Sequence, residues 1–336
     1  RYDGGAIFQK PVCHEERSFL DAKLFQILLM TEKKMSTIKK RGARSDKNDI
    51  VFVALMLVLP TLQFLIFYIG TNVNSFALAF QRYEYGEFVF EGWSNFEKVF
   101  SSLASDAEVA FSMKNSFVVY IIGLIVSIPL SILFSYYIFK KFALNRTFKV
   151  LLFLPSLLSA LTLCILYRYF TDLAVPEVIK KMFGVKVDGL FSGAKTEYAS
   201  LLFAYVFFSF GSTMLLYLGA MSGISESVTE AAEIDGASDW MQLIRIVIPM
   251  IFPTIKTFFI CGIAGLFSNQ FNLLNFYGIG AKPAYETIGY YFYKLTIIGS
   301  ENYAYVAAFG LLLSAVLIPV TLLINRVLNK VQDKLI

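Results

Sequence analysis

The chain has 336 residues, of which 57% are hydrophobic and only 16% are charged, and its formal net charge is +5. Soluble globular domains carry about a quarter of charged residues, so this composition excludes an ordinary soluble domain and indicates a membrane protein. No nucleic-acid motif accompanies the basic residues, which lie beside apolar segments, so we expect them to meet lipid headgroups and not nucleic acid.

Residues 1–49 form a basic leader ahead of the first apolar segment. Residues 18–30 would form an amphipathic helix at the membrane surface if they belong to the native protein. An equally good explanation is that residues 1–34 are not native, because Met35 begins a short basic leader of its own. No uncharged core with a cleavage site precedes the first apolar segment, so the leader does not read as a secretory signal.

Six uncharged apolar segments follow, each near the ~20 residues that a membrane-spanning helix requires. They are residues 50–70, 115–139, 150–167, 198–225, 257–281 and 302–325. The sequence therefore predicts an all-α integral membrane protein with six transmembrane helices. Its expected parts are the leader, a first helix with an outer loop over residues 50–110, a transmembrane core over 111–330 and a tail over 331–336.

The Lys and Arg residues beside these segments predict the orientation. They cluster at residues 33–47 and at 140–149, and such basic flanks stay in the cytoplasm. Residues 71–111 are rich in Glu and Asp, as expected of an outer loop. Residues 172–197 are as basic as a cytoplasmic loop, but the number of spans places them outside. Both termini are then cytoplasmic.

The six segments contain no Asp, Glu, Lys, Arg or His. Ion-coupled carriers usually place such a residue in the membrane, so we expect the driving energy to come from elsewhere. A phosphate-binding loop needs GxxxxGK followed by Ser or Thr, and Gly193–Thr196 resembles only its end. Cys13, Cys164, Cys261 and the single His14 are scattered, so we expect no disulfide, no metal site, no cofactor and no catalytic residue in this chain.

A polar segment, residues 230–249, interrupts the apolar runs between the fourth and fifth predicted spans. Ala231 and Ala232 favour a short helix that a partner can approach closely, and Gly236 permits a sharp turn. Apolar residues at helical spacing then predict a second short helix, which prolines 249 and 253 would separate from the next span. The segment therefore predicts a helix, a bend and a second helix outside the membrane.

The spacing of this segment resembles the EAA motif of binding-protein-dependent ABC importer permeases, written EAA, three residues, G, nine residues, I, one residue and LP. The matching residues are Glu230, Ala231, Ala232, Gly236, Ile246 and Pro249, with Ile248 in place of Leu. Residues Asp235, Ala237 and Pro253 extend the match to the sugar branch of the MetI-like permeases, and Gly92–Phe96 and Asn115–Ser116 resemble two further segments of that branch. Ser225, Leu243 and residues 278–283 depart from its pattern.

The resemblance implies that the chain is a multi-pass permease subunit in the cytoplasmic membrane of a prokaryote and has no nucleotide site of its own. Its implied partners are a second, homologous permease subunit, two ATPase subunits, an extracytoplasmic solute-binding protein and a sugar or oligosaccharide. The EAA segment would dock on an ATPase and couple ATP hydrolysis to alternating access. Its expected coupling residues are Glu230, Ala231, Ala232, Asp235 and Gly236.

Neutral amide side chains are unusually dense in the fifth predicted span. On a helix, residues 268, 271, 272 and 275 would share a face, so amides beside a Phe ring would meet the hydroxyls and the apolar face of a sugar. The predicted substrate path is Asn269, Phe271, Asn272 and Asn275. The same amides would equally serve as hydrogen-bonding contacts between packed helices.

Other functions remain open from the sequence. An ABC permease for a peptide, an amino acid or a phosphate-containing compound would carry the same EAA segment, because that segment reports coupling and not cargo. A stand-alone secondary carrier would need intramembrane charges or a recognisable repeat, neither of which the sequence offers. A membrane scaffold or enzyme that uses the polar loop for docking is a further alternative.

Overall fold

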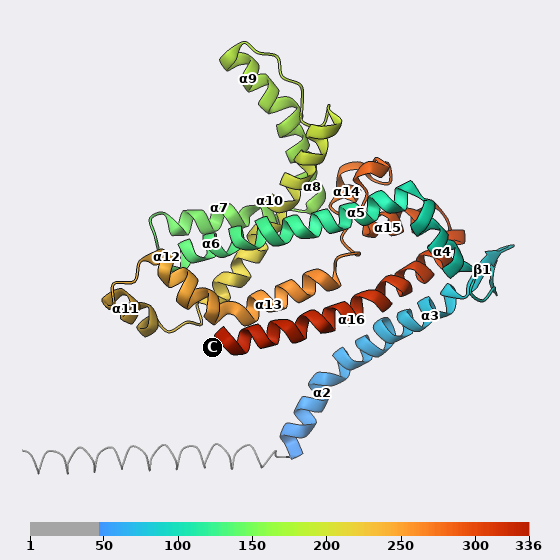
Figure 1. Cartoon of the computed structure of the whole chain (residues 1–336), viewed down its shortest axis with the longest axis horizontal. Helices are drawn as coiled ribbons and strands as arrows, with labels where there is room; N and C mark the ends of the chain where they lie inside the picture. Colours follow the sequence, from blue (N-terminus) through green and yellow to red (C-terminus); the bar gives the residue numbers. More distant parts are fainter. Residues whose placement is uncertain (1–46, 336) are drawn as a thin grey trace, which may run out of the picture. The chain divides into compact units, whose positions relative to one another are not determined.

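The computed structural model describes residues 47–335, and most of them are helical, as the sequence predicts (Figure 1). The expectations for residues 18–30, Cys13 and His14 lie outside the described residues. The chain divides between Val73 and Asn74 into two compact units.

The first unit ends in a single apolar helical run. It comprises α2 (Lys47–Gln63), a π-helical turn (Phe64–Ile69) and the beginning of α3 (Gly70–Ala79). The run suitable for crossing a membrane covers Val51–Ala79, 29 residues, and so extends beyond the predicted residues 50–70. Its apolar side chains are exposed, as expected of a surface that meets lipid.

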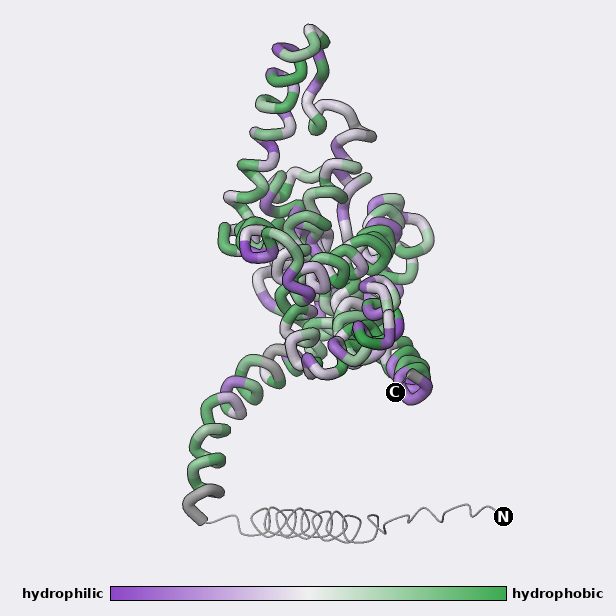
Figure 2. The backbone as a smooth tube through the Cα atoms, turned by 90° about the vertical axis from the view of Figure 1, so that its left-hand side faces the viewer, coloured by the Kyte–Doolittle hydropathy of each residue, from purple (hydrophilic) through white to green (hydrophobic). Residues whose placement is uncertain are grey.

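The second unit contains the remaining helices, whose long apolar stretches are visible in Figure 2. They are α4 (Ser94–Ser105), α5 (Ala107–Ile122), α6 (Ile128–Phe139), α7 (Asn145–Leu157), α8 (Ala160–Tyr169), α9 (Val175–Phe183), α10 (Ala194–Met221), α11 (Glu226–Ile234), α12 (Asp239–Gln242), α13 (Ile248–Ala264), α14 (Leu273–Tyr277), α15 (Ile288–Ile298) and α16 (Tyr303–Leu335). Within residues 47–335, five helices are long and apolar enough to cross a membrane, or six if one bent pair counts as a span.

That bent pair replaces the third predicted span. Residues 145–157 and 160–183 form two helical runs that meet at 106°. Leu158 has an extended backbone, and the Ser159 hydroxyl accepts a hydrogen bond from the Thr162 N–H at 3.2 Å, so Ser159 begins a new helix. The predicted span over residues 150–167 is therefore not a single helix, because the apolar run contains a helix start at Ser159.

Prolines lie inside several long helices without ending them. The π-helical turns Gly123–Ser127, Phe170–Ala174 and Leu243–Val247 each end two residues before a proline. The wider turn accommodates a residue that has no N–H and whose ring would clash with the preceding turn. As a result α12, the third of these turns and α13 form one run over Asp239–Ala264, and the predicted break at prolines 249 and 253 is wrong.

The fifth span therefore lies earlier in the chain than residues 257–281. Its helix ends at Ala264, and only the short α14 follows within the predicted segment. The run includes Lys256, whose Nζ donates to Asn329 Oδ1 at 2.9 Å and Gln332 Oε1 at 2.6 Å on α16. Other spans also extend to ionisable residues, among them Glu108, Arg168 and Glu197. We expected spans without charged residues. That expectation fails because the helices extend beyond the uncharged runs and so include charged residues near their ends.

The predicted outer loop over residues 71–111 is structured. Strands β1 (Gln81–Glu84) and β2 (Glu87–Phe90) form an antiparallel hairpin, in which Tyr85 and Gly86 both have positive φ in a tight two-residue turn. The Asn95 amide donates to the carbonyl oxygens of Ala79, at 3.0 Å, and Gln81, at 2.7 Å. Asn95 thus fixes the start of the hairpin against α4.

Helix α10 lies at the centre of the second unit, where it packs against α6, α7 and α13. Its crossing with α7 is close at Gly211, where a Cβ would collide with the Leu152 carbonyl oxygen. Small residues allow such close approach between membrane helices. Near one end of α10, Tyr217, Met221, Leu243 and Val247 pack in one buried apolar cluster, which joins α11 and α12 to the helices.

Candidate functional site

The polar segment between α10 and α13 forms the expected short helix and bend. Helix α11 ends in two backbone bonds, from the Gly236 N–H to the Glu233 carbonyl at 3.0 Å and from the Ala237 N–H to the Ala232 carbonyl at 2.9 Å. Gly236 has φ +78°, so the helix closes with glycine in the left-handed region, where residues with a Cβ are strained. The chain then enters α12 directly.

The five expected coupling residues divide between an exposed and a buried side of α11. Glu230, Ala231, Asp235 and Gly236 are exposed, whereas Ala232 is buried against the helices. Next to them, the Ile234 side chain is 86% exposed, and Trp240 and Ile244 are exposed as well. Polar groups and large apolar side chains are therefore both exposed on α11 and α12, which is typical of segments that bind a protein partner.

Lys140, at the end of α6, attaches α11 and α12 to the helices. Its Nζ lies 2.5 Å from Glu233 Oε1, 3.0 Å from Gln242 Oε1 and 3.4 Å from Asp239 Oδ1. Burial would lower the pKa of Lys140, but its hydrogen bonds to Glu233 and Asp239 prevail and raise the pKa above its usual value. The ammonium group is therefore held in its charged form between both halves of the bend.

Two further side chains support this arrangement. The buried Gln242 amide donates to the Ala237 carbonyl at 2.8 Å, and the Tyr136 hydroxyl donates to the Asp239 carbonyl at 2.9 Å. Sequence reasoning missed these residues and Lys140. Only the basic flank at residues 140–149 pointed to this side of the protein, and nothing in the sequence pairs Lys140 with a carboxylate about a hundred residues away.

Three predicted substrate-path residues, Asn269, Phe271 and Asn272, lie in a non-helical turn between α13 and α14, and the fourth, Asn275, lies within α14. Phe271 has φ +55° and Asn272 has φ +56°, so the shared helical face proposed for residues 268, 271, 272 and 275 does not exist. The turn and α14 nevertheless gather Asn269, Asn272 and Asn275 around one cavity of about 450 Å³. Gln270, Tyr205, Phe208 and the serines 156, 209 and 212 also line it.

The amides of this cavity have different partners. Asn269 is structural, since its Nδ2 donates to the Tyr205 hydroxyl at 3.1 Å and its Oδ1 accepts the Phe271 N–H at 2.8 Å. Within residues 47–335, the side chains of Gln270, Asn272 and Asn275 form no hydrogen bond. These three amides are partly exposed and therefore have their donors and acceptors available to a solute.

Phe271 contributes little of its ring to this cavity. Its side chain is 1% exposed and packs against the rings of Tyr198 and Tyr205, with centroids 6.2 and 5.7 Å away. A residue at positive φ projects its side chain differently from one on a helix, and here the ring enters the core. We therefore find no platform for a sugar ring at Phe271 in this conformation.

A buried charge cluster joins α5 to the segment before α15. The Lys294 ammonium contacts both carboxylate oxygens of Glu286 at 2.8 Å and also pairs with Glu108. Burial raises the pKa of Glu286, Lys294 opposes that rise, and the neighbouring Glu108 adds to it. The pKa of Lys294 is raised because its bonds to the two carboxylates outweigh its burial. One ammonium group thus serves two carboxylates.

Asn115 and Ser116, which resemble the start of a sugar-permease span, form hydrogen bonds beside this charge cluster. Asn115 donates to the carbonyl oxygens of Ala284, at 2.8 Å, and Glu286, at 3.0 Å, and the Ser116 hydroxyl accepts the Ile288 N–H at 2.9 Å. Both residues lie within α5, which begins at residue 107. Their hydrogen bonds connect α5 to the segment before α15.

In residues 47–335 no group of three or more His, Cys, Asp or Glu side chains is placed to hold a metal ion.

Comparisons with known proteins agree with this arrangement. Residues 123–333 match the family described as binding-protein-dependent transport system inner membrane component. The arabinooligosaccharides transport system permease protein AraP of Bacillus subtilis (strain 168) is 26% identical over 279 residues, which cover 78% of this chain and 83% of AraP. The lactose transport system permease protein LacF of Rhizobium radiobacter is 28% identical over 174 residues, or 50% of this chain and 58% of LacF.

A solved structure shares the fold. It belongs to a bacterial ABC transporter involved in the import of the acidic polysaccharide alginate, and it superposes with a TM-score of 0.70 at 20% identity. The match covers 84% of this chain and 96% of the other. A second solved structure, of a bacterial alginate ABC transporter in complex with an alginate pentasaccharide-bound periplasmic protein, also superposes with a TM-score of 0.70 at 20% identity and covers 85% of this chain and 96% of the other.

Proposed function

The chain belongs to the family of binding-protein-dependent transport system inner membrane components, and we propose that it is the permease subunit of an ATP-driven ABC importer for a sugar or oligosaccharide. In this role it forms half of the translocation path and has no nucleotide site of its own. A second permease subunit, two ATPase subunits and an extracytoplasmic solute-binding protein complete the importer. The names of the relatives AraP and LacF support a carbohydrate cargo.

The amide cavity is the single observation that carries the choice of cargo. None of its lining residues is charged, and three of its amides, on Gln270, Asn272 and Asn275, have no hydrogen-bond partner within residues 47–335. A hydroxyl both donates and accepts, so a neutral, hydroxyl-rich solute satisfies unpaired amides without bringing a charge that the cavity leaves uncompensated. A phosphate-containing compound or a free amino acid would bring such a charge.

The surface around α11 supports the coupling role. Its exposed Glu230, Ala231 and Asp235 lie beside Ile234, while Lys140 and Gln242 hold the bend from behind. A docked ATPase that moves this surface would move α6 and α13 with it, since both are attached to the bend. In this orientation α11 and the basic residues 140–149 face the cytoplasm, as do both termini.

The test is to purify the chain together with the proteins encoded beside it and to measure ATP hydrolysis in lipid. We expect a stable complex with an ATPase, and hydrolysis that rises several-fold when a sugar-loaded binding protein is added. Stimulation by an amino acid or a peptide alone would contradict the carbohydrate cargo. Purification without any ATPase would contradict the importer.

A further inference from the structure

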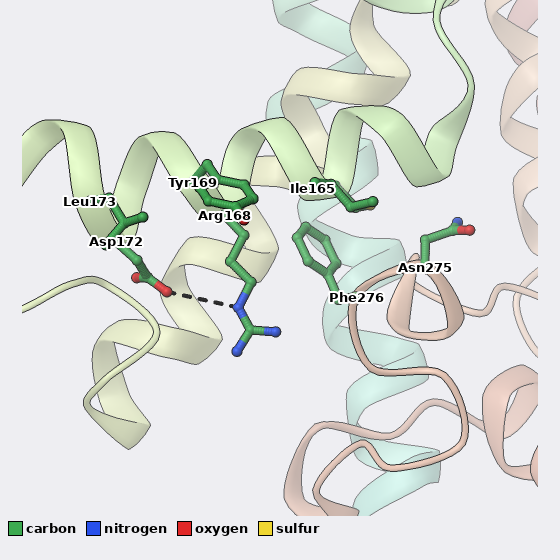
Figure 3. Close-up of a pocket in the computed structure, with 8 residues that line it drawn as sticks. Ile165, Arg168, Tyr169, Asp172, Leu173, Asn275 and Phe276 are labelled. Carbon is green, nitrogen blue, oxygen red and sulfur yellow. Dashed lines mark ion pairs between the residues drawn. The ribbon is translucent and has the colours of Figure 1, made fainter.

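A second cavity adjoins the amide cavity. It has a volume of about 390 Å³, and Asn275 lines both cavities. Arg168, Tyr169 and Asp172 contribute its other polar groups, from α8 and the π-helical turn that follows it. Figure 3 shows the Arg168 side chain extending from this helix toward Asp172, with Asn275 on the neighbouring segment. Unlike the first cavity, this one contains charged groups.

Arg168 is held in place by its neighbours. Its guanidinium carbon lies 5.6 Å from the ring centroid of Phe191 and 5.9 Å from that of Tyr277, and its Nε lies 3.8 Å from Asp172 Oδ2. Two cation–π contacts and one carboxylate therefore restrain the guanidinium group of this 51% exposed side chain. Within the part of the chain that the structure describes, the Arg168 guanidinium forms no hydrogen bond, so its terminal N–H groups are available to a ligand.

Asp172 is fixed in the same way. Its Oδ1 accepts the Phe191 N–H at 3.0 Å, and a Cβ on the adjacent Gly189 would collide with it at 2.5 Å. Its Oδ2, on the side of Arg168, remains as an acceptor. The cavity thus presents ordered donors on Arg168, an ordered acceptor on Asp172 and the amide of Asn275, which both donates and accepts.

This combination suits adjacent hydroxyl groups. A hydroxyl beside Arg168 would accept from the guanidinium fork, while its neighbour would donate to Asp172. The charges nearby cancel in pairs, since Arg168 faces Asp172 and Lys282 Nζ lies 2.5 Å from Glu197 Oε2. A carboxylated sugar would bring a charge for which the cavity has no counter-ion left, because Asp172 already balances Arg168, and so it would be disfavoured.

We propose that this second cavity is a binding subsite for a further, uncharged glycosyl unit of the cargo, next to the unit in the amide cavity. The proposal rests on the proposed function and adds two properties to it. The cargo is at least a disaccharide, with Asn275 lying between its neighbouring units. Asp172 selects against uronic acids, and Arg168 binds the vicinal hydroxyls of the second unit.

The test uses the complete complex in proteoliposomes with saturating sugar-loaded binding protein, so that the binding protein's own affinity does not enter the maximal uptake rate. The probes are galactotriose, arabinotriose and maltotriose, their monosaccharides and trigalacturonate. We expect the wild-type complex to carry at least one neutral trisaccharide faster than its monosaccharide. The variant R168Q should lower that trisaccharide rate about tenfold and change the monosaccharide rate less than twofold.

Two matched variants separate binding from folding. R168K keeps the charge but loses the planar fork, so it should behave like R168Q. K181Q removes an exposed lysine of the same helical run, which pairs with the exposed Glu177, and should leave both rates unchanged. D172N keeps the side-chain shape and the bond to the Phe191 N–H, and should raise the trigalacturonate rate relative to galactotriose.

The results have distinct meanings. Equal losses for trisaccharide and monosaccharide in R168Q, or unchanged rates for both, would overturn the subsite while leaving the sugar importer intact. Faster trigalacturonate than galactotriose transport in the wild-type complex would also overturn it. A wild-type complex that no sugar stimulates would overturn the proposed function and the subsite together.

Discussion

At the scale of single residues, two largely buried lysines hold separate segments of this chain together. Lys140 bridges the two halves of the bend between α11 and α12, and Lys294 bridges Glu108 and Glu286. Both ammonium groups are largely buried and both have a raised pKa. Such groups cannot be replaced as freely as exposed lysines, because each serves more than one acceptor.

The variant K140M should loosen α11 and α12 from the helices. Removing the Lys140 ammonium group should lower the free energy of unfolding by about 1 kcal/mol, since the carboxylates of Glu233 and Asp239 are half-exposed and can be solvated by water. We expect a lower melting temperature and a several-fold decrease of solute-stimulated ATP hydrolysis in the purified complex. The matched control is K141M, because Lys141 is 77% exposed and pairs with the exposed Glu226, at 3.4 Å. An equal effect of both variants would contradict the role of Lys140.

The variant K294M should have a free energy of unfolding about 3 kcal/mol lower than that of the wild type, because it leaves the carboxylates of Glu108 and Glu286 without their cation.

The stability of K294M should also depend on pH. The pKa of Glu286 is already raised in the folded chain, and losing Lys294 removes the group that opposes this rise. A raised carboxyl pKa gives stability that is present below the usual pKa, near 4.5, and lost as the pH rises through the folded value.

Melting temperatures between pH 5 and pH 8 in detergent would check this prediction. K294M should melt at a lower temperature as the pH rises, with a steeper dependence than the wild-type chain. The double variant K294M/E286Q should recover part of the stability and flatten the dependence, because one of the two carboxylates no longer ionises. A K294M profile parallel to that of the wild type would show that the cluster does not control stability.

At the scale of elements, the bend after α11 is the part most directly explained by its sequence. The Gly236 φ of +78° and the two backbone bonds that close α11 match the turn expected from Gly236 alone. No atom lies within 4 Å of a Cβ built at this glycine, so only backbone strain opposes a side chain there. A substitution of Gly236 therefore strains the backbone of the bend and does not disturb the packing of side chains around it.

The variant G236V should decrease solute-stimulated ATP hydrolysis strongly while membrane insertion stays normal. A β-branched residue at this φ costs about 1 to 3 kcal/mol, which α11 can relieve by changing the angle of the bend. G236N should be much milder, because Asn tolerates the left-handed region. G184V provides a second control, since Gly184 has φ +68° and open space around it at the end of α9. Normal stimulation in G236V would contradict the role of the bend.

The sequence predicted the helical class, the approximate positions of four of the six spans and the short helix with its bend, while the third span is a bent pair and the fifth lies earlier in the chain. It failed where the local signal for a helix start or end is weak. Ser159 begins a new helix inside an apolar run, and α13 ends at Ala264, before the turn in which Phe271 and Asn272 have positive φ. Pro249 seemed to mark a break, but the π-helical turn before it keeps the helix continuous.

The candidate sites were predicted to a different degree. The amides 269, 272 and 275 do line one cavity, although the turn before α14 and α14 itself, and not one helical face, bring them together. Amide density was a usable signal because unpaired amides are costly inside a membrane protein. Lys140, Gln242 and Arg168 escaped detection because their roles depend on contacts between segments far apart in the sequence or on rings placed by the fold.

At the scale of the whole molecule, the two candidate sites belong to one helical framework. The Lys140 anchor lies at the end of α6, and α10, which packs against α6, provides Tyr205, Phe208 and Ser209 to the amide cavity. The helix that follows the bend, α13, ends at the turn that carries the amides. Movement of α11 would therefore reach the cavity through rigid helices, as alternating access requires.

The measurement that tests this account most directly is uptake of a labelled neutral sugar into proteoliposomes that contain the complete complex, with ATP enclosed and loaded binding protein outside. The account predicts accumulation of the sugar above its outside concentration, dependent on ATP and abolished when this chain is omitted. Equilibration of the sugar by this chain alone, without ATP or an ATPase subunit, would contradict the account and identify a stand-alone carrier.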